Sequence, residues 1–157
     1  MKLSRNSYVS TKRDAWVEIN LGNLENNVLE IKKHLHKGVK LLAVIKADAY
    51  GHGAVMCAPI LLASGVDMFG VASIDEAQQL RDAGVTSEIL VLGAIPVWAV
   101  EYAAQNNITF SIFCDEHIEA CRQCFEKTGL KPKAHIKLDT GMNRIGVGKD
   151  DAVEFIN

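Results

Sequence analysis

The sequence predicts an α/β fold made of repeated strand–helix units, and three observations support this. Short apolar runs alternate with segments whose apolar residues recur at helical spacing over most of the 157 residues. The strands expected after the first helix begin near residues 41, 67, 88, 108 and 133, so their starts are 20 to 26 residues apart. The run Leu41–Lys46 is nearly all apolar, as in a strand buried on both faces. This pattern is typical of a parallel sheet with right-handed crossovers.

The expected elements follow one another in a regular order along the chain. Trp16–Asn20 alternates like a short strand, and the helix after it has Asn20 as its expected N-cap and Gly38 as its stop. Ser73 and Glu76 have the spacing of a capping box. Strands are predicted at 41–46, 67–71, 88–92, 108–113 and 133–138, and helices at 21–35, 54–64, 74–83, 97–106, from Asp115 to Gly129, and from Asp150 or Asp151 onward.

Composition points to an ordinary globular protein. Apolar residues make up 48% of the chain, charged residues 23%, and the net charge is −2, which indicates no nucleic-acid partner. No apolar run approaches the length of a membrane span. Residues 1–14 are polar and are predicted to be a flexible leader rather than a secretory signal, which favours a cytoplasmic location. Residues 15–157 are expected to belong to one domain.

The cysteines and histidines show no metal-binding pattern. Cys121 and Cys124 form a C-x-x-C pair, but it lies in a helical pattern and has no second ligand pair. Both are therefore interpreted as structural helix residues. His34 and His36 are two residues apart on an expected helix, so they point to different faces.

Two architectures fit the strand spacing: an open doubly wound sheet or part of a (β/α)8 barrel. The segment after the strand at 41–46 lacks the glycine-rich fingerprint of dinucleotide-binding sheets. A complete barrel takes roughly 250 residues, so the chain is predicted to hold about the first five βα units of a TIM-type barrel. Because it ends within an expected helix, it looks truncated.

Lys46 is the first candidate functional residue. It ends an otherwise apolar strand, where a charge is costly to bury, and barrel enzymes place working residues at such strand ends. A desolvated lysine is a nucleophilic amine suited to Schiff-base formation, although a salt-bridged structural lysine is the alternative. Tyr50 offers a hydroxyl in the next loop, where Gly51 and Gly53 allow close approach of a ligand.

A second group of polar residues follows the last expected strand and would face the same mouth of a barrel. Arg144 carries a planar guanidinium suited to a carboxylate or a phenolic oxygen, although it could also be a solvated loop residue. Lys137 and Asp139 could form a local ion pair at the strand end.

Three segments resemble alanine racemases. Residues 43–53 (AVIKADAYGHG) resemble the cofactor-lysine signature of that family, residues 16–22 (WVEINLG) resemble its opening segment, and residues 135–146 (HIKLDTGMNRIG) resemble its second hallmark. The segments occur in the family's order, and the resemblance spans about residues 14 to 157. Two specific motifs in the correct order carry far more weight than a single match.

The resemblance implies a role for each matching residue. Lys46 would hold pyridoxal 5'-phosphate as a Schiff base and then act as the base on one face of the substrate. Tyr50 would bind the cofactor phosphate, and Arg144 the cofactor's phenolic oxygen and the substrate carboxylate. Lys137, carbamylated in many family members, would orient Arg144. Asp48 and His52 are assigned only to loop architecture.

The resemblance also implies an activity and a partner. The family interconverts L-alanine and D-alanine, which supplies peptidoglycan synthesis, and its homodimers share active sites. The second catalytic base, a tyrosine, comes from the partner subunit's C-terminal domain, a β domain that this chain does not contain. The chain alone is therefore expected to have little or no racemase activity. A broad-specificity or serine racemase, a non-catalytic cofactor-binding barrel protein, and a purely structural Lys46 are the alternatives.

Overall fold

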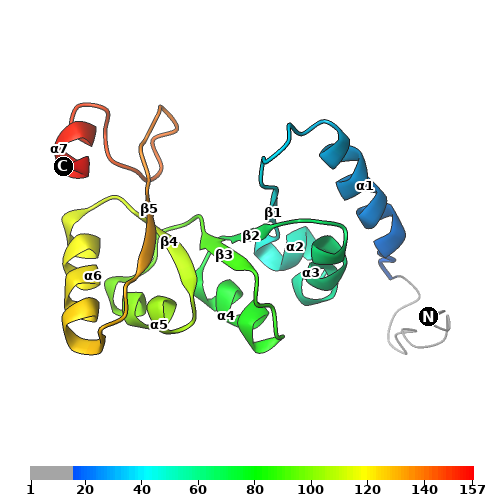
Figure 1. Cartoon of the computed structure of the whole chain (residues 1–157), viewed down its shortest axis with the longest axis horizontal. Helices are drawn as coiled ribbons and strands as arrows, with labels where there is room; N and C mark the ends of the chain where they lie inside the picture. Colours follow the sequence, from blue (N-terminus) through cyan, green and yellow to red (C-terminus); the bar gives the residue numbers. More distant parts are fainter. Residues whose placement is uncertain (1–15) are drawn as a thin grey trace.

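The computed structural model describes residues 16–157, and its five strands form one parallel sheet (Figure 1). The order is β1-β2-β3-β4-β5, so each crossover adds the next strand on the same side. A doubly wound sheet reverses direction at a switch point, whereas a barrel does not. The order confirms the prediction of about five units of a (β/α)8 barrel. The strands are β1 Leu42–Val44, β2 Met68–Val71, β3 Glu88–Val91, β4 Ile108–Ile112 and β5 Lys133–Ile136.

The helices α3 to α6 lie along one side of this sheet (Figure 1). Among the described helices, none is long and apolar enough to cross a membrane. The predicted leader, residues 1–14, lies outside the described residues, and the cytoplasmic location stays a prediction. The helices are α1 Leu21–Lys33, α2 Lys46–Gly51, α3 Ala54–Ala63, α4 Ile74–Asp82, α5 Val100–Gln105 after the 3-10 turn η1 Val97–Ala99, α6 Asp115–Thr128 and α7 Ala152–Ile156.

The core lies between the sheet and these helices. Alternate residues of a strand point to the same face, and six residues on the helix-covered face of the three central strands are at most 1% exposed, whereas Ile112 at the end of β4 is only partly buried. The prediction that the first parallel strand is buried on both faces is wrong, because Val44 is 39% exposed and β1 is only partly buried. The core residues on the helix-covered face are Phe69, Val71, Ile89, Val91, Ile108 and Phe110.

Local signals in the sequence placed most helix ends correctly. The side chain of Asn20 accepts a hydrogen bond from Asn23 N (3.0 Å), as an N-cap does. The strand predicted at Trp16–Asn20 is wrong: no strand forms there, and Val17 is 82% exposed. The helix predicted from Asp115 does begin there, but Asp115 does not cap it: Cys114 is the capping residue of α6, and its side chain makes no cap bond.

Arg81 ties the amino-terminal edge of the sheet together. Its guanidinium donates to the carbonyl oxygens of Val85, Ser87, Asn106 and Asn107 at 2.6–2.9 Å. These carbonyls belong to the loops that lead into β3 and β4, so one side chain fixes the start of each strand. Burial lowers the pKa of Arg81 from its ordinary value.

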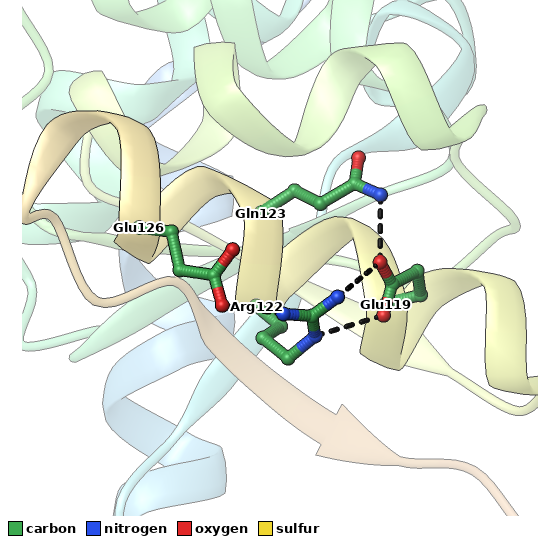
Figure 2. Close-up of polar contacts among 4 residues, drawn as sticks. All are labelled: Glu119, Arg122, Gln123 and Glu126. Carbon is green, nitrogen blue, oxygen red and sulfur yellow. Dashed lines mark hydrogen bonds and ion pairs between the residues drawn. The ribbon is translucent and has the colours of Figure 1, made fainter.

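The outer face of α6 carries a network of exposed charges (Figure 2). Arg122 pairs with Glu119 (2.7 Å) and Glu126, and Gln123 donates to Glu119 (2.7 Å). Because these groups are largely solvated, the pairs contribute little to stability. Cys121 and Cys124 lie on the same helix as free thiols, with Cys124 buried, in agreement with their structural interpretation.

Candidate active site

Lys46 lies at the carboxyl edge of the sheet, just beyond β1. The strand ends at Val44, and the N–H of Ile45 still donates to the carbonyl oxygen of Gly70 at 2.9 Å. Lys46 therefore follows the strand rather than ending it, and its side chain is only partly buried. The edge is the one at which barrel enzymes hold their working residues.

The chain turns in an unusual way directly after Lys46. Residues 47–50 have φ between 48° and 55° and ψ between 37° and 50°, so four consecutive non-glycine residues form a left-handed helical turn. Such a conformation costs about 1–2 kcal/mol per residue. A strained segment of this kind persists only where its surroundings fix it, and strained segments cluster at functional sites. No local pattern signals this turn, since alanine and aspartate are common in ordinary loops.

Hydrogen bonds hold the left-handed turn at both ends. Glu76 Oε1 accepts from Ala47 N and Glu76 Oε2 from Ala72 N, each at 2.7 Å. At the other end, Asp48 Oδ1 accepts from Ala54 N at 2.7 Å, the first residue of α3. His52 Nδ1 lies 2.9 Å from the carbonyl oxygen of Ala49. Asp48 and His52 thus make the local contacts expected of residues that shape the loop.

The amine of Lys46 and the phenol of Tyr50 are available for a ligand. Lys46 Nζ lies 6.0 Å from the centroid of the Tyr50 ring, and Tyr50 is 61% exposed. Within residues 16–157, neither Lys46 Nζ nor the Tyr50 hydroxyl has a hydrogen-bond partner, and Lys46 has no ion pair. The alternative of a salt-bridged structural lysine finds no support there. A largely apolar cavity beside α1 includes Tyr50 but not Lys46.

The second polar group lies on a loop whose two ends are joined by backbone hydrogen bonds; this junction is called the neck of the loop. Lys137 N donates to Ile112 O (2.9 Å), Asp139 N donates to Val147 O (2.8 Å), and Val147 N donates to Lys137 O (2.8 Å). Residues 139–146 therefore project from the carboxyl edge as a pinned loop. Arg144 is exposed on it, and Lys137 is partly buried at its base.

Asp139 organises the interior of this loop. Its Oδ1 accepts from Gly141 N (2.9 Å) and Asn143 N (3.0 Å). The alternative of a Lys137–Asp139 ion pair is wrong, because no ion pair joins them within the described chain. The hydrogen bonds from the backbone of Gly141 and Asn143 lower the pKa of the Asp139 carboxyl.

We expect the order of this loop to depend on acidic pH. A carboxyl with a lowered pKa stabilises the folded loop above the ordinary aspartate value, near pH 4, and this contribution is lost as the pH falls through the lowered value. NMR titration of the Gly141 and Asn143 amide protons should give a midpoint below that of a free aspartate. Asp139→Asn keeps an acceptor and should abolish the transition. A midpoint at or above the ordinary value would contradict this.

The two polar groups share an edge but stand on opposite flanks of the sheet. Lys46 follows β1 and Arg144 follows β5, the first and last strands in the order (Figure 1). No hydrogen bond joins Arg144 to Lys46 or Tyr50 in the described structure. The sequence predicts that Lys46 and Arg144 face one barrel mouth. They do lie at the same edge of the sheet, but they follow its first and last strands.

The similarity of this chain to known proteins identifies its family. A family model described as alanine racemase, N-terminal domain, matches residues 19–157. The chain belongs to that family. Alanine racemase 1 of Oceanobacillus iheyensis is 44% identical over 145 residues, 92% of this chain and 39% of that protein.

Solved structures of amino-acid racemases share the fold. The structure of alanine racemase from Bacillus anthracis with bound L-Ala-P has a TM-score of 0.83 and 37% identity over 93% of this chain and 38% of that one. Histidine racemase from Leuconostoc mesenteroides has the same TM-score of 0.83 and 36% identity, over 96% of this chain and 40% of that chain. The chain spans about two fifths of the length of the curated alanine racemases that it matches (39% and 40%).

The donor set at the carboxyl edge of the sheet fits an anionic aldehyde cofactor. A primary amine, a phenol and a guanidinium lie there, and none of the hydrogen bonds or ion pairs among residues 16–157 involves the Lys46 amine, the Tyr50 hydroxyl or the Arg144 guanidinium. An amine can attach covalently to an aldehyde, and the other two can bind phosphate, phenolate or carboxylate oxygens. Sequence reasoning found these three residues but missed Glu76 as a contact of the Lys46 turn, because its spacing from Ser73 already explained it as a cap.

Proposed function

We propose that this chain supplies the cofactor-attachment part of a pyridoxal-phosphate-dependent racemase that interconverts L-alanine and D-alanine. The observation that carries the proposal is the Lys46 amine, which is partly buried just beyond β1, has no hydrogen bond or ion pair within residues 16–157, and is followed by a strained turn held by hydrogen bonds. Family membership over residues 19–157 supports it. When bound, the cofactor supplies an electron sink for the substrate carbanion.

Each of the candidate residues has a distinct role in this proposal. Lys46 Nζ attaches the cofactor and moves a proton at one face of the substrate Cα. The Tyr50 hydroxyl binds the cofactor phosphate, and the Arg144 guanidinium binds the substrate carboxylate and the cofactor's phenolic oxygen. Lys137, at the base of the Arg144 loop, orients the Arg144 guanidinium, as the family resemblance implies.

Racemisation also needs an acid–base group on the opposite face of Cα, and Lys46 supplies only one face. In line with the family resemblance, we propose that the second group comes from a partner subunit in a homodimer. The purified 157-residue chain alone should therefore show little or no racemase activity. A coupled assay for D-alanine in which this chain matches a full-length racemase would contradict that expectation.

Covalent trapping tests the central claim. The chain is incubated with pyridoxal 5'-phosphate and reduced with borohydride, and the labelled peptide is identified by mass spectrometry. The label should fall on Lys46 and disappear in Lys46→Ala, while Lys149→Ala, an exposed lysine on the same chain, should label normally. Labelling spread evenly over the surface lysines would rule out Lys46 as the attachment point.

A second candidate function is the same racemisation chemistry acting on a different amino acid. The likeness to the Leuconostoc histidine racemase favours an amino-acid racemase of different or broader specificity, serine included, as an alternative. A panel of L-amino acids offered to the protein, with chiral analysis of the products, distinguishes the two. A non-catalytic cofactor-binding barrel protein would label on Lys46 and racemise none of them.

A further inference from the structure

Glu76 departs from the role that its sequence position predicts. In a capping box, the glutamate three residues after the N-cap returns to the backbone N–H of the N-cap residue. Ser73 does cap α4, since its Oγ accepts from Glu76 N at 3.3 Å. The Glu76 carboxylate, however, accepts from Ala72 N and Ala47 N at 2.7 Å each. The carboxylate thus links the segments that follow β1 and β2.

The contact with Ala47 bears directly on Lys46. The peptide unit that carries the Ala47 N–H begins at the carbonyl carbon of Lys46, so fixing that N–H fixes the plane attached to the Lys46 Cα. It is also the first N–H of the left-handed turn, where the chain leaves the sheet. A charge-assisted bond at this point opposes relaxation of the turn to ordinary backbone geometry.

Glu76 is held in place by the buried residues next to it in α4. It lies in the first turn of α4, next to Ala77, which is 0% exposed, and one turn before Leu80, which is 1% exposed. The side chain is partly buried, so it is not a freely rotating surface group. The neighbouring Asp75 is exposed, and none of the hydrogen bonds formed by side chains in the described chain involves it.

We infer that Glu76 is a positioning residue that sets the direction of the Lys46 side chain by holding the peptide unit after it. This inference rests on the proposed attachment of pyridoxal 5'-phosphate to Lys46. It assigns Glu76 no contact with cofactor or substrate. Its effect should appear as faster and more selective attachment at Lys46, relative to the other lysines of the same chain.

The test measures borohydride-trapped labelling in the full 157-residue chain, both on Lys46 and on the exposed Lys149 as an internal reference. Glu76→Ala should slow Lys46 labelling about tenfold or more, the factor lost with one charge-assisted hydrogen bond, and leave Lys149 unchanged. Glu76→Gln keeps one acceptor oxygen and should fall in between. Asp75→Ala removes a charge from the same helical turn and should match the wild type.

The outcomes separate the inference from the proposed function. If wild-type chain does not label preferentially at Lys46, the proposed function fails first. If it does, and Glu76→Ala and Glu76→Gln label Lys46 at the rate of Asp75→Ala, the positioning role is overturned. Urea unfolding of each variant identifies loss of folding. Should Glu76→Ala unfold, Glu76→Gln decides: an intermediate rate with a wild-type unfolding midpoint supports the inference, and a wild-type rate overturns it.

Discussion

Phe110→Ala is expected to lower the free energy of unfolding by about 3–5 kcal/mol. Phe110 lies in β4 on the helix-covered face of the sheet, and its side chain is 0% exposed. Removing the ring forfeits its burial and leaves a cavity that a packed core closes only in part. Against the roughly 5–15 kcal/mol of a typical domain, the loss is a large fraction of the total.

Urea unfolding followed by circular dichroism measures this effect, and Phe125→Ala is the matched control. Phe125 lies on α6 and is 48% exposed, with Lys131 Nζ 5.9 Å from its ring centroid. Its removal should cost about 1 kcal/mol or less, since it gives up partial burial and one exposed cation–π contact. Equal losses in the two variants would mean that the sheet–helix core is not the main source of stability.

The fold was predictable because its signals are local and periodic. Apolar runs at regular spacing indicated the five parallel strands, and residues such as Asn20 and Ser73 marked helix starts through their own side-chain bonds. The error at Trp16–Asn20 has a physical cause. Alternation shows that a segment could cover a face, but a strand also needs a partner, and that segment pairs with none of the described strands.

The candidate site was predictable in its residues but not in its geometry. Lys46 was found because a charge at the end of an apolar strand is anomalous, and Arg144 because it follows a strand at the same edge. The left-handed turn was not predictable, since no glycine marks residues 47–50 and the turn is held by Glu76, 29 residues further along the chain. Contacts of that range depend on the assembled sheet rather than on local sequence.

Gly146→Ala is expected to disrupt the loop that carries Arg144. Gly146 has φ +132°, and a Cβ there would lie 2.5 Å from Asp139 N and 2.8 Å from the carbonyl carbon of Leu138. Both are backbone atoms at the pinned neck of the loop, so neither can move aside cheaply. Backbone strain and overpacking each cost about 1–3 kcal/mol, and the Asp139–Val147 bond should break first.

Trypsin cleavage after Arg144 reports on this loop directly, and two other glycines separate strain from clash. Gly148→Ala meets only Asp151 Oδ2 at 3.5 Å and should cleave like the wild type. Gly141→Ala has φ +121° but open space, so it should show the effect of strain alone. We expect cleavage to accelerate from Gly148→Ala through Gly141→Ala to Gly146→Ala. If Gly146→Ala cleaves no faster than Gly148→Ala, close packing at the neck does not hold Arg144 in place, and the loop depends on Asp139 instead.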